Sequence, residues 1–302
     1  MKPSGSAATG SAWHSDIGGH AALKCLQQRA LECAEGNWSF YLRLRPADAN
    51  ALANYGIVLT MREKYEAAIP QFEKAIDLGE GSHDIFAHYA DSLGKVGRTN
   101  DAIDWSYKTL VVVPTLVDVR GSLAKLLVLQ KRHHEALALL TSFDEQLSRQ
   151  GHAAYFTGQR IAIESSIARA GLSQANEQAG LRLAKVGDHF FVPVTLGSAR
   201  PSAFVVDTGA AKTTLSEELL ENSKAVYKVE RNETRVQTAD GRISTARLVN
   251  IESMKVGAFA LKNISALVCR GCVSLLGQAS LSKFDIKSSR IQGVEFLTLV
   301  PR

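Results

Sequence analysis

The fold of the C-terminal part is decided by the stretch Phe204-Val205-Val206-Asp207-Thr208-Gly209-Ala210. Its apolar residues, rich in β-branched side chains, predict a buried strand, and the acid, hydroxyl residue and glycine after them predict a tight turn. Gly209 has no Cβ, so the backbone can approach the carboxylate closely. The stretch therefore predicts that the strand ends in one carboxylate, that of Asp207.

Two further motifs follow this turn along the chain. The first is Asp240-Gly241, a tight hairpin signal that lies between two stretches of alternating apolar residues. The second is Val273-Ser274-Leu275-Leu276-Gly277, an apolar pair and a glycine before a short helical turn. In this order the motifs resemble the retropepsin-like aspartic proteases over residues 187–300. The bacterial single-domain forms often read Leu-Leu-Gly-Met-Ser-Phe-Leu, whereas here Gln278-Ala279-Ser280-Leu281 follows the glycine.

The resemblance implies an aspartic endopeptidase that acts on a protein or peptide substrate. Asp207, Thr208 and Gly209 would form the catalytic turn. A flap at about 236–243 would cover the substrate with Thr238, Ala239, Asp240 and Gly241, and Leu275, Leu276 and Gly277 would support the site. Since Asp-Thr-Gly occurs once in the chain, the second carboxylate is expected from Asp207 of another copy, in a symmetric homodimer. No metal or cofactor is expected.

Period-two alternation begins near His189 and predicts an all-β barrel for the C-terminal part. Short helices are expected at 216–222, where Ser216 is an N-cap candidate, and at 278–282. The expected strands are 189–197, 202–207, 225–230, 233–238, 242–250, 252–256, 258–261, 264–269, 283–287 and 296–300.

The N-terminal part carries an internal repeat of a different kind. Ala68, Ala102 and Ala136 are spaced by 34 residues, and each stands in a similar helical pattern. Small residues at such positions allow two helices to approach closely, while large neighbours fill the remaining space. The period resembles the tetratricopeptide repeat (TPR), which implies a solenoid of helical hairpins whose concave face binds a protein partner or peptide.

The expected architecture therefore combines an α-helical solenoid with an all-β protease barrel. We expect repeats at about 49–82, 83–116 and 117–150, a degenerate unit before them, and a last helix at about 152–170. The expected domains are a disordered leader at 1–19, the repeats at 20–171, a linker at 172–186 and the protease-like domain at 187–302. The adjacent His133 and His134 lie near the start of an expected helix, where neighbouring residues point in different directions, so a surface turn is expected there in place of a metal site.

Composition and charge limit the classes of partner and the cellular locations that are expected for the chain. The net charge of +5 lies in the C-terminal part, where from Leu183 onward 16 Lys and Arg residues stand against 11 Asp and Glu residues. These cations are scattered with few aromatics between them, which favours a solvated face over nucleic-acid binding. No apolar run reaches the length of a membrane span. The N-terminus lacks the apolar core of a signal peptide, so a cytoplasmic location is expected, or the periplasm if an export signal was removed.

Two alternative functions remain open from the sequence. In one, the chain is a non-catalytic adaptor whose repeats bind a partner while the barrel serves dimerisation or peptide binding. In the other, Cys269 and Cys272 make the chain responsive to redox state or metal, since they have C-x-x-C spacing shortly before Leu275. The other two cysteines are Cys25 and Cys33, and four are too few for a fold built on disulfides.

Overall fold

The computed structural model describes residues 19–169, 180–237 and 243–302. The chain divides into two compact units, Met1–Thr115 and Leu116–Arg302, and each is described by itself. The expected leader lies almost wholly outside the described residues. No helix within the described ranges is both long enough and apolar enough to cross a membrane.

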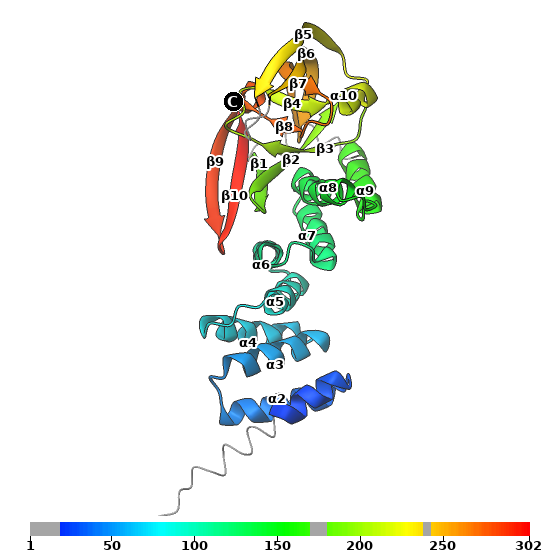
Figure 1. The fold of residues 1–302 in the computed structure, drawn as a ribbon. Helices are drawn as coiled ribbons and strands as arrows, with labels where there is room; N and C mark the ends of the chain where they lie inside the picture. Colours follow the sequence, from blue (N-terminus) through cyan, green and yellow to red (C-terminus); the bar gives the residue numbers. More distant parts are fainter. Residues whose placement is uncertain (1–18, 170–179, 238–242) are drawn as a thin grey trace, which may run out of the picture. The chain divides into compact units, whose positions relative to one another are not determined.

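The first unit is a stack of antiparallel helical hairpins (Figure 1). Residues 19–27 are helical and precede α2 (Leu31–Leu44). Two hairpins follow, with helices α3 (Ala49–Met61), α4 (Tyr65–Asp77), α5 (His83–Lys95) and α6 (Thr99–Val112). Together with the 34-residue period, these hairpins give the unit the architecture of a TPR solenoid.

The backbone repeats with the same period as the sequence. Arg29, Glu63, Gly97 and Lys131 are spaced by 34 residues, and all have left-handed φ angles, of 57°, 59°, 84° and 60°. Each residue lies in the short connection that follows the first helix of a hairpin, where a left-handed residue commonly ends a helix. The period therefore extends into the degenerate unit that precedes the first repeat.

Small residues hold the two helices of a hairpin together. Ala68 and Ala102 are fully buried, and a Cβ added to Gly56 of α3 would come within 2.8 Å of the Phe72 ring of α4. The ring of Tyr89 in α5 lies 5.8 Å from that of Phe72 and 5.1 Å from that of Trp105 in α6. Aromatic side chains thus link successive hairpins where the small residues leave room.

The second unit begins with α7 (Val117–Leu129), α8 (His133–Arg149) and α9 (Thr157–Arg169). Helix α8 is buried from His133 to Asp144, because it packs between α7, α9 and strands β1–β3 (Figure 1). The expectation of a surface turn for His133 and His134 is therefore wrong: their exposed fractions are 7% and 9%. Solvent is excluded from both by the elements that pack around α8.

Within the described residues, ten strands follow in one sheet (Figure 1). The short helices α10 (Glu217–Ser223) and α11 (Gln278–Leu281) interrupt them. The strands are β1 (Leu181–Val186), β2 (His189–Leu196), β3 (Ser202–Val206), β4 (Thr213–Ser216), β5 (Tyr227–Gln237), β6 (Ile243–Val256), β7 (Phe259–Cys269), β8 (Leu275–Leu276), β9 (Phe284–Ile291) and β10 (Val294–Pro301).

The strand order is β5-β6-β7-β4-β8-β3-β2-β1-β10-β9, with a further pairing of β6 with β2. That pairing closes β6, β7, β4, β8, β3 and β2 into a ring around a core that contains Phe204, Val249 and Met254. Ala138 of α8 joins the same core cluster. The observed architecture is the expected helical repeats followed by an all-β region.

The strands differ from their expected bounds in three ways. Strands β5, β6 and β7 are each one long strand where two were expected, and β5 continues across register shifts between Val229 and Thr234. The short strands β4 and β8 were not expected. Neither was β1, which lies within the expected linker at 172–186 and pairs with β10. Residues 172–179 of that linker lie outside the described residues, so the expected domain bounds stay a prediction.

Candidate active site

Asp207 directly follows β3, and its backbone is tied to the neighbouring strand. Strands β3 and β8 are parallel, with Val205 opposite Leu275 and Val206 opposite Leu276. The Asp207 amide donates to the Leu276 carbonyl (3.1 Å), and the Val205 amide donates to the Ser274 carbonyl (2.9 Å). The structure thus brings the Asp-Thr-Gly and Leu-Leu-Gly motifs together across a parallel pairing.

The turn after Asp207 holds one oxygen of its carboxylate. Oδ1 accepts hydrogen bonds from the amides of Gly209 (2.9 Å) and Ala210 (3.2 Å). No hydrogen bond to Oδ2 is found within the described residues of this chain. The turn therefore holds one carboxylate oxygen in place, and the other accepts no hydrogen bond from the described residues.

Thr208 and Gly209 are exposed at the top of this turn. The Thr208 carbonyl accepts a hydrogen bond from Nε2 of Gln278 (2.8 Å). The sequence predicts that the Thr208 hydroxyl braces the turn. The described hydrogen bonds include none to this hydroxyl, so its role stays a prediction.

Gly277 lies where only a glycine fits. A Cβ at this position would come within 2.3 Å of the Lys212 carbonyl oxygen and 2.7 Å of the Ala210 carbonyl oxygen. The next two amides, of Gln278 and Ala279, donate to the carbonyls of Ala210 (2.8 Å) and Ala211 (3.2 Å). This close approach is the physical reason for the glycine in the Leu-Leu-Gly motif.

A buried hydrogen bond between two hydroxyl groups joins β4 to α11 next to the Asp207 turn. The Oγ atoms of Thr213 in β4 and Ser280 in α11 lie 2.7 Å apart, and both side chains are fully buried. Thr213, Gln278 and Ser280 were not expected among the residues that support the Asp207 turn. The signal was present in the Gln-Ala-Ser-Leu that follows Gly277, where a polar residue stands on each side of Ala279.

The expected flap lies largely outside the described residues, and these include none of Thr238, Ala239, Asp240 and Gly241. The strands on either side do pair: Gln237 of β5 is opposite Ile243 of β6. The hairpin that the sequence predicted is therefore present up to these two residues. The role of its tip as a flap stays a prediction.

The cysteines are paired within the described chain, Cys25 with Cys33 and Cys269 with Cys272. The second disulfide spans the connection from β7 to β8, which is the strand that supports Asp207. The described residues contain no group of three or more His, Cys, Asp or Glu side chains that could hold a metal ion.

Comparison with known families agrees with this geometry. Residues 192–283 match the family described as gag-polyprotein putative aspartyl protease. This segment is therefore similar to a retropepsin-like aspartyl protease domain. The match runs from β2 to Lys283 and includes Asp207, the paired strands β5 and β6, and Gly277. None of the curated proteins matches the chain.

Several solved structures resemble the helical part. The TPR protein MamA from Desulfovibrio magneticus RS-1 is 17% identical, with a TM-score of 0.42, and the match covers 45% of this chain and 76% of that one. The TPR domain of Arabidopsis OM64 is 14% identical, with a TM-score of 0.36, over 39% of this chain and 97% of that one. YrrB, described as a TPR protein with an unusual peptide-binding site, is 24% identical, with a TM-score of 0.39, over 41% of this chain and 64% of that one.

Proposed function

We propose that the chain is an aspartic endopeptidase that hydrolyses peptide bonds of a protein substrate, with Asp207 as its catalytic carboxylate. The observation that carries the proposal is the position of Asp207. Its carboxylate lies on an exposed turn, with one oxygen held by the amides of Gly209 and Ala210, within a segment that matches an aspartyl protease family.

The second carboxylate comes from Asp207 of another copy, because Asp-Thr-Gly occurs once in the sequence. A twofold axis through the site would bring the two carboxylates together. Two carboxyl groups at close quarters do not both ionise readily, so the pair shares one proton. One carboxylate then takes a proton from a water molecule between them, and the other donates a proton to the carbonyl oxygen of the scissile bond.

Other parts of the chain would recruit the substrate and cover it in the active site. The hairpin of β5 and β6 would close over it and exclude water, with Thr238 to Gly241 at its tip. The helical repeats would recruit the substrate or a partner protein on their concave face, since stacked hairpins present an extended concave surface.

Of the two expected compartments we propose the periplasm, because disulfides such as Cys25–Cys33 and Cys269–Cys272 persist in oxidising compartments.

The test compares Asp207→Asn with the unaltered protein on unfolded protein substrates across acidic and neutral pH. Asp188→Asn is a matched control, because Asp188 is an exposed residue in the turn between β1 and β2. We expect Asp207→Asn to abolish cleavage, and Asp188→Asn to leave it unchanged. Cleavage by Asp207→Asn at the rate of the unaltered protein would refute the mechanism.

Mixing the two proteins tests the shared pair of carboxylates. If each site needs Asp207 from two copies, an equal mixture at exchange equilibrium retains about a quarter of the activity per dimer, since mixed dimers are inactive. Independent sites would retain about half. A protein that dimerises but cleaves nothing under any condition would instead support the non-catalytic adaptor.

A further inference from the structure

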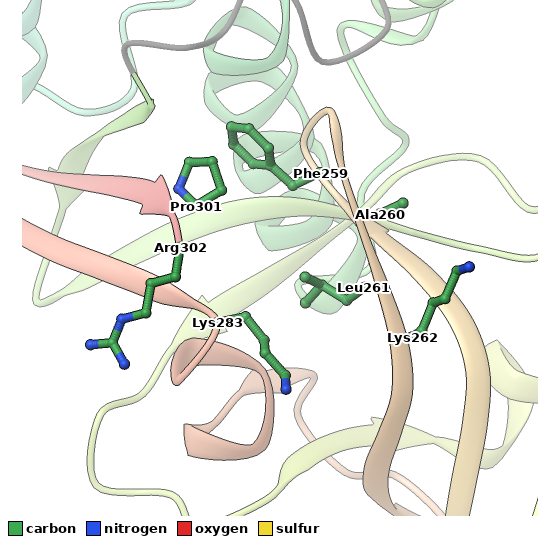
Figure 2. A pocket seen from close by; sticks show the side chains of 7 residues that line it. All are labelled: Phe259, Ala260, Leu261, Lys262, Lys283, Pro301 and Arg302. Carbon is green, nitrogen blue, oxygen red and sulfur yellow. The ribbon is translucent and has the colours of Figure 1, made fainter.

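A second candidate site lies away from the Asp207 turn. A pocket of about 520 Å³ is lined by Phe259, Ala260, Leu261 and Lys262 of β7, and by Lys283, Pro301 and Arg302 (Figure 2). Its volume is within the range of about 300–1,000 Å³ that is usual for ligand sites. None of the residues proposed for catalysis or substrate support lines it.

The wall formed by β7 is an open strand edge. Strand β4 pairs with β7 only from Ala266 onward, so the residues of β7 before that point have a strand neighbour on one side only, β6. Val256 and Phe259 flank a two-residue turn and therefore form a hydrogen-bonded pair. By alternation, the amides and carbonyls of Ala260 and Lys262 point away from β6. Two sets of main-chain donors and acceptors are thus available along the pocket.

Cations surround this edge. Lys262 and Lys283 are exposed, and no salt bridge to either is found in the described part of the chain. The Arg302 guanidinium is held in place by the Asp285 carboxylate (2.8 Å) and the Ser282 carbonyl (3.2 Å). Asp285 offsets the charge of Arg302, so the two lysines supply the excess positive charge of the pocket.

The apolar lining adds a third feature. Phe259 and Leu261 are buried, with exposed fractions of 4% and 8%, and Pro301 lies on the opposite wall (Figure 2). Open main-chain groups favour an extended chain, and unpaired lysines favour acidic side chains. A small anion would satisfy the lysines but would leave the amides and carbonyls of Ala260 and Lys262 unused.

We propose that this pocket binds an extended acidic peptide segment of a partner protein, which adds to β7 as a further strand. The main chain of the peptide pairs with Ala260 and Lys262, and its acidic side chains lie near Lys262 and Lys283. This binding is independent of the proposed catalysis, since it uses none of the residues around Asp207.

The experiment measures binding of a short fluorescent peptide that alternates Glu with Val, by anisotropy, to the full chain. The Asp207→Asn background prevents cleavage of the probe. The same peptide with Lys in place of Glu is the control ligand. We expect the Glu peptide to bind, and the combined variant Lys262→Glu, Lys283→Glu to weaken binding at least about tenfold. The matched control is Lys228→Glu with Lys287→Glu, two exposed lysines outside the pocket, and it should keep the original affinity.

The strand pairing is tested at Ala260. Ala260→Pro removes an outward amide, so we expect binding about three- to tenfold weaker, whereas Ala260→Val keeps the amide and should bind as before.

Equal binding of the Glu and Lys peptides, or an equal loss of affinity in the pocket and control lysine variants, would overturn the proposal. So would displacement of the peptide by inorganic phosphate but not by potassium chloride of equal ionic strength, because it would show a simple anion site. Self-association without peptide that Ala260→Pro abolishes would also overturn it, since a second copy would then occupy the edge.

Discussion

The Glu145 carboxylate of α8 accepts a hydrogen bond from the Ala203 amide of β3, with 3.2 Å between Oε2 and N. Alternate amides of a strand point to the same side, so the amides of Ala203, Val205 and Asp207 form one series. Val205 and Asp207 donate to the carbonyls of Ser274 and Leu276 in or next to β8. Because β3 and β8 are parallel, Ala203 lies before the N-terminal end of β8. There the Glu145 carboxylate accepts the hydrogen bond that a β8 carbonyl would otherwise accept.

Replacing Glu145 should loosen this strand. Glu145→Leu leaves the Ala203 amide without its acceptor, which we expect to cost about 1–2 kcal/mol of unfolding free energy in the second unit. Hydrogen exchange, measured by mass spectrometry over residues 202–208, should become faster. Glu145→Gln keeps an acceptor oxygen and should lie close to the unaltered protein.

The control for this prediction is Arg149→Ala. Arg149 pairs with Oε1 of Glu145 on the exposed side of α8, and its loss should cost less than about 1 kcal/mol. If Glu145→Leu and Arg149→Ala gave the same exchange rates over β3, the carboxylate would have no role in holding the strand.

Gly277→Ala should disrupt the support of the Asp207 turn. The added Cβ would lie 2.3 Å from the Lys212 carbonyl oxygen, which is backbone and has no rotamer by which to move away. We expect a loss of about 1–3 kcal/mol or more in unfolding free energy. Gly158→Ala, where a Cβ meets nothing within 4 Å, should be neutral or slightly stabilising in the same urea titration. Equal stability of the two variants would contradict the close approach.

The stability of the second unit should depend on pH through His134. Burial lowers the pKa of His134 to about 4 from its ordinary value of 6.5, with smaller effects from His133 and Lys255. Between these values the unfolded chain binds this proton and the folded chain does not, so the unfolding free energy falls as the pH is lowered from about 6.5 to about 4. At the acidic end the loss amounts to roughly 3 kcal/mol, and it is absent above about pH 7.

His134→Gln should remove this part of the pH dependence, as measured by hydrogen exchange of α8 and β1 in urea at several pH values. His152→Gln, at an exposed position in the same unit, should retain the original pH dependence. A slope that His134→Gln leaves unchanged would show that another group is responsible.

Two equivalent left-handed positions in the repeats allow a pair of opposite substitutions to be compared. Glu63 and Gly97 occupy the same place in successive hairpins, with φ angles of 59° and 84°. Glu63→Gly relieves the strain of a side chain at positive φ and should stabilise the first unit by about 0.5–1 kcal/mol, whereas Gly97→Ala should destabilise it by a similar amount. Urea unfolding followed by the fluorescence of the buried Trp38 and Trp105 measures both. Shifts of the same sign would disprove the shared conformation.

The helices of the repeats were predictable because their signal is local and recurs. Ala68, Ala102 and Ala136 are buried at the same position of successive hairpins, and α3 to α8 form three pairs of helices with that period. The turn of Asp207 was predictable for a related reason, since Asp-Thr-Gly and Leu-Leu-Gly each carry their own backbone geometry. In both cases a short segment contains most of the information that fixes its structure.

The unpredicted features depend on residues far apart in the sequence. Strand β1 forms by pairing with β10, where Leu181 lies opposite Leu299. The sequence of residues 181–186 alone does not identify that distant partner strand. Glu145 reads as a solvent-facing acid near the end of a helix, and His134 as part of a surface turn, until strands cover α8. The break expected between residues 230 and 233 does not occur, because β5 absorbs its irregular residues as register shifts.

The parallel pairing of β3 with β8 also sets an order of events during synthesis. Each helical hairpin of the first unit is complete within one repeat, so it can form as soon as that repeat leaves the ribosome. Val205, in contrast, must wait for Leu275, and Leu181 must wait for Leu299. Contacts between such distant residues form slowly, because a long loop must close before they contribute. The growing chain therefore carries folded repeats well before it carries an ordered Asp207 turn, and a ribosome that stalls before Leu276 leaves a chain that has its helical repeats but no assembled carboxylate site.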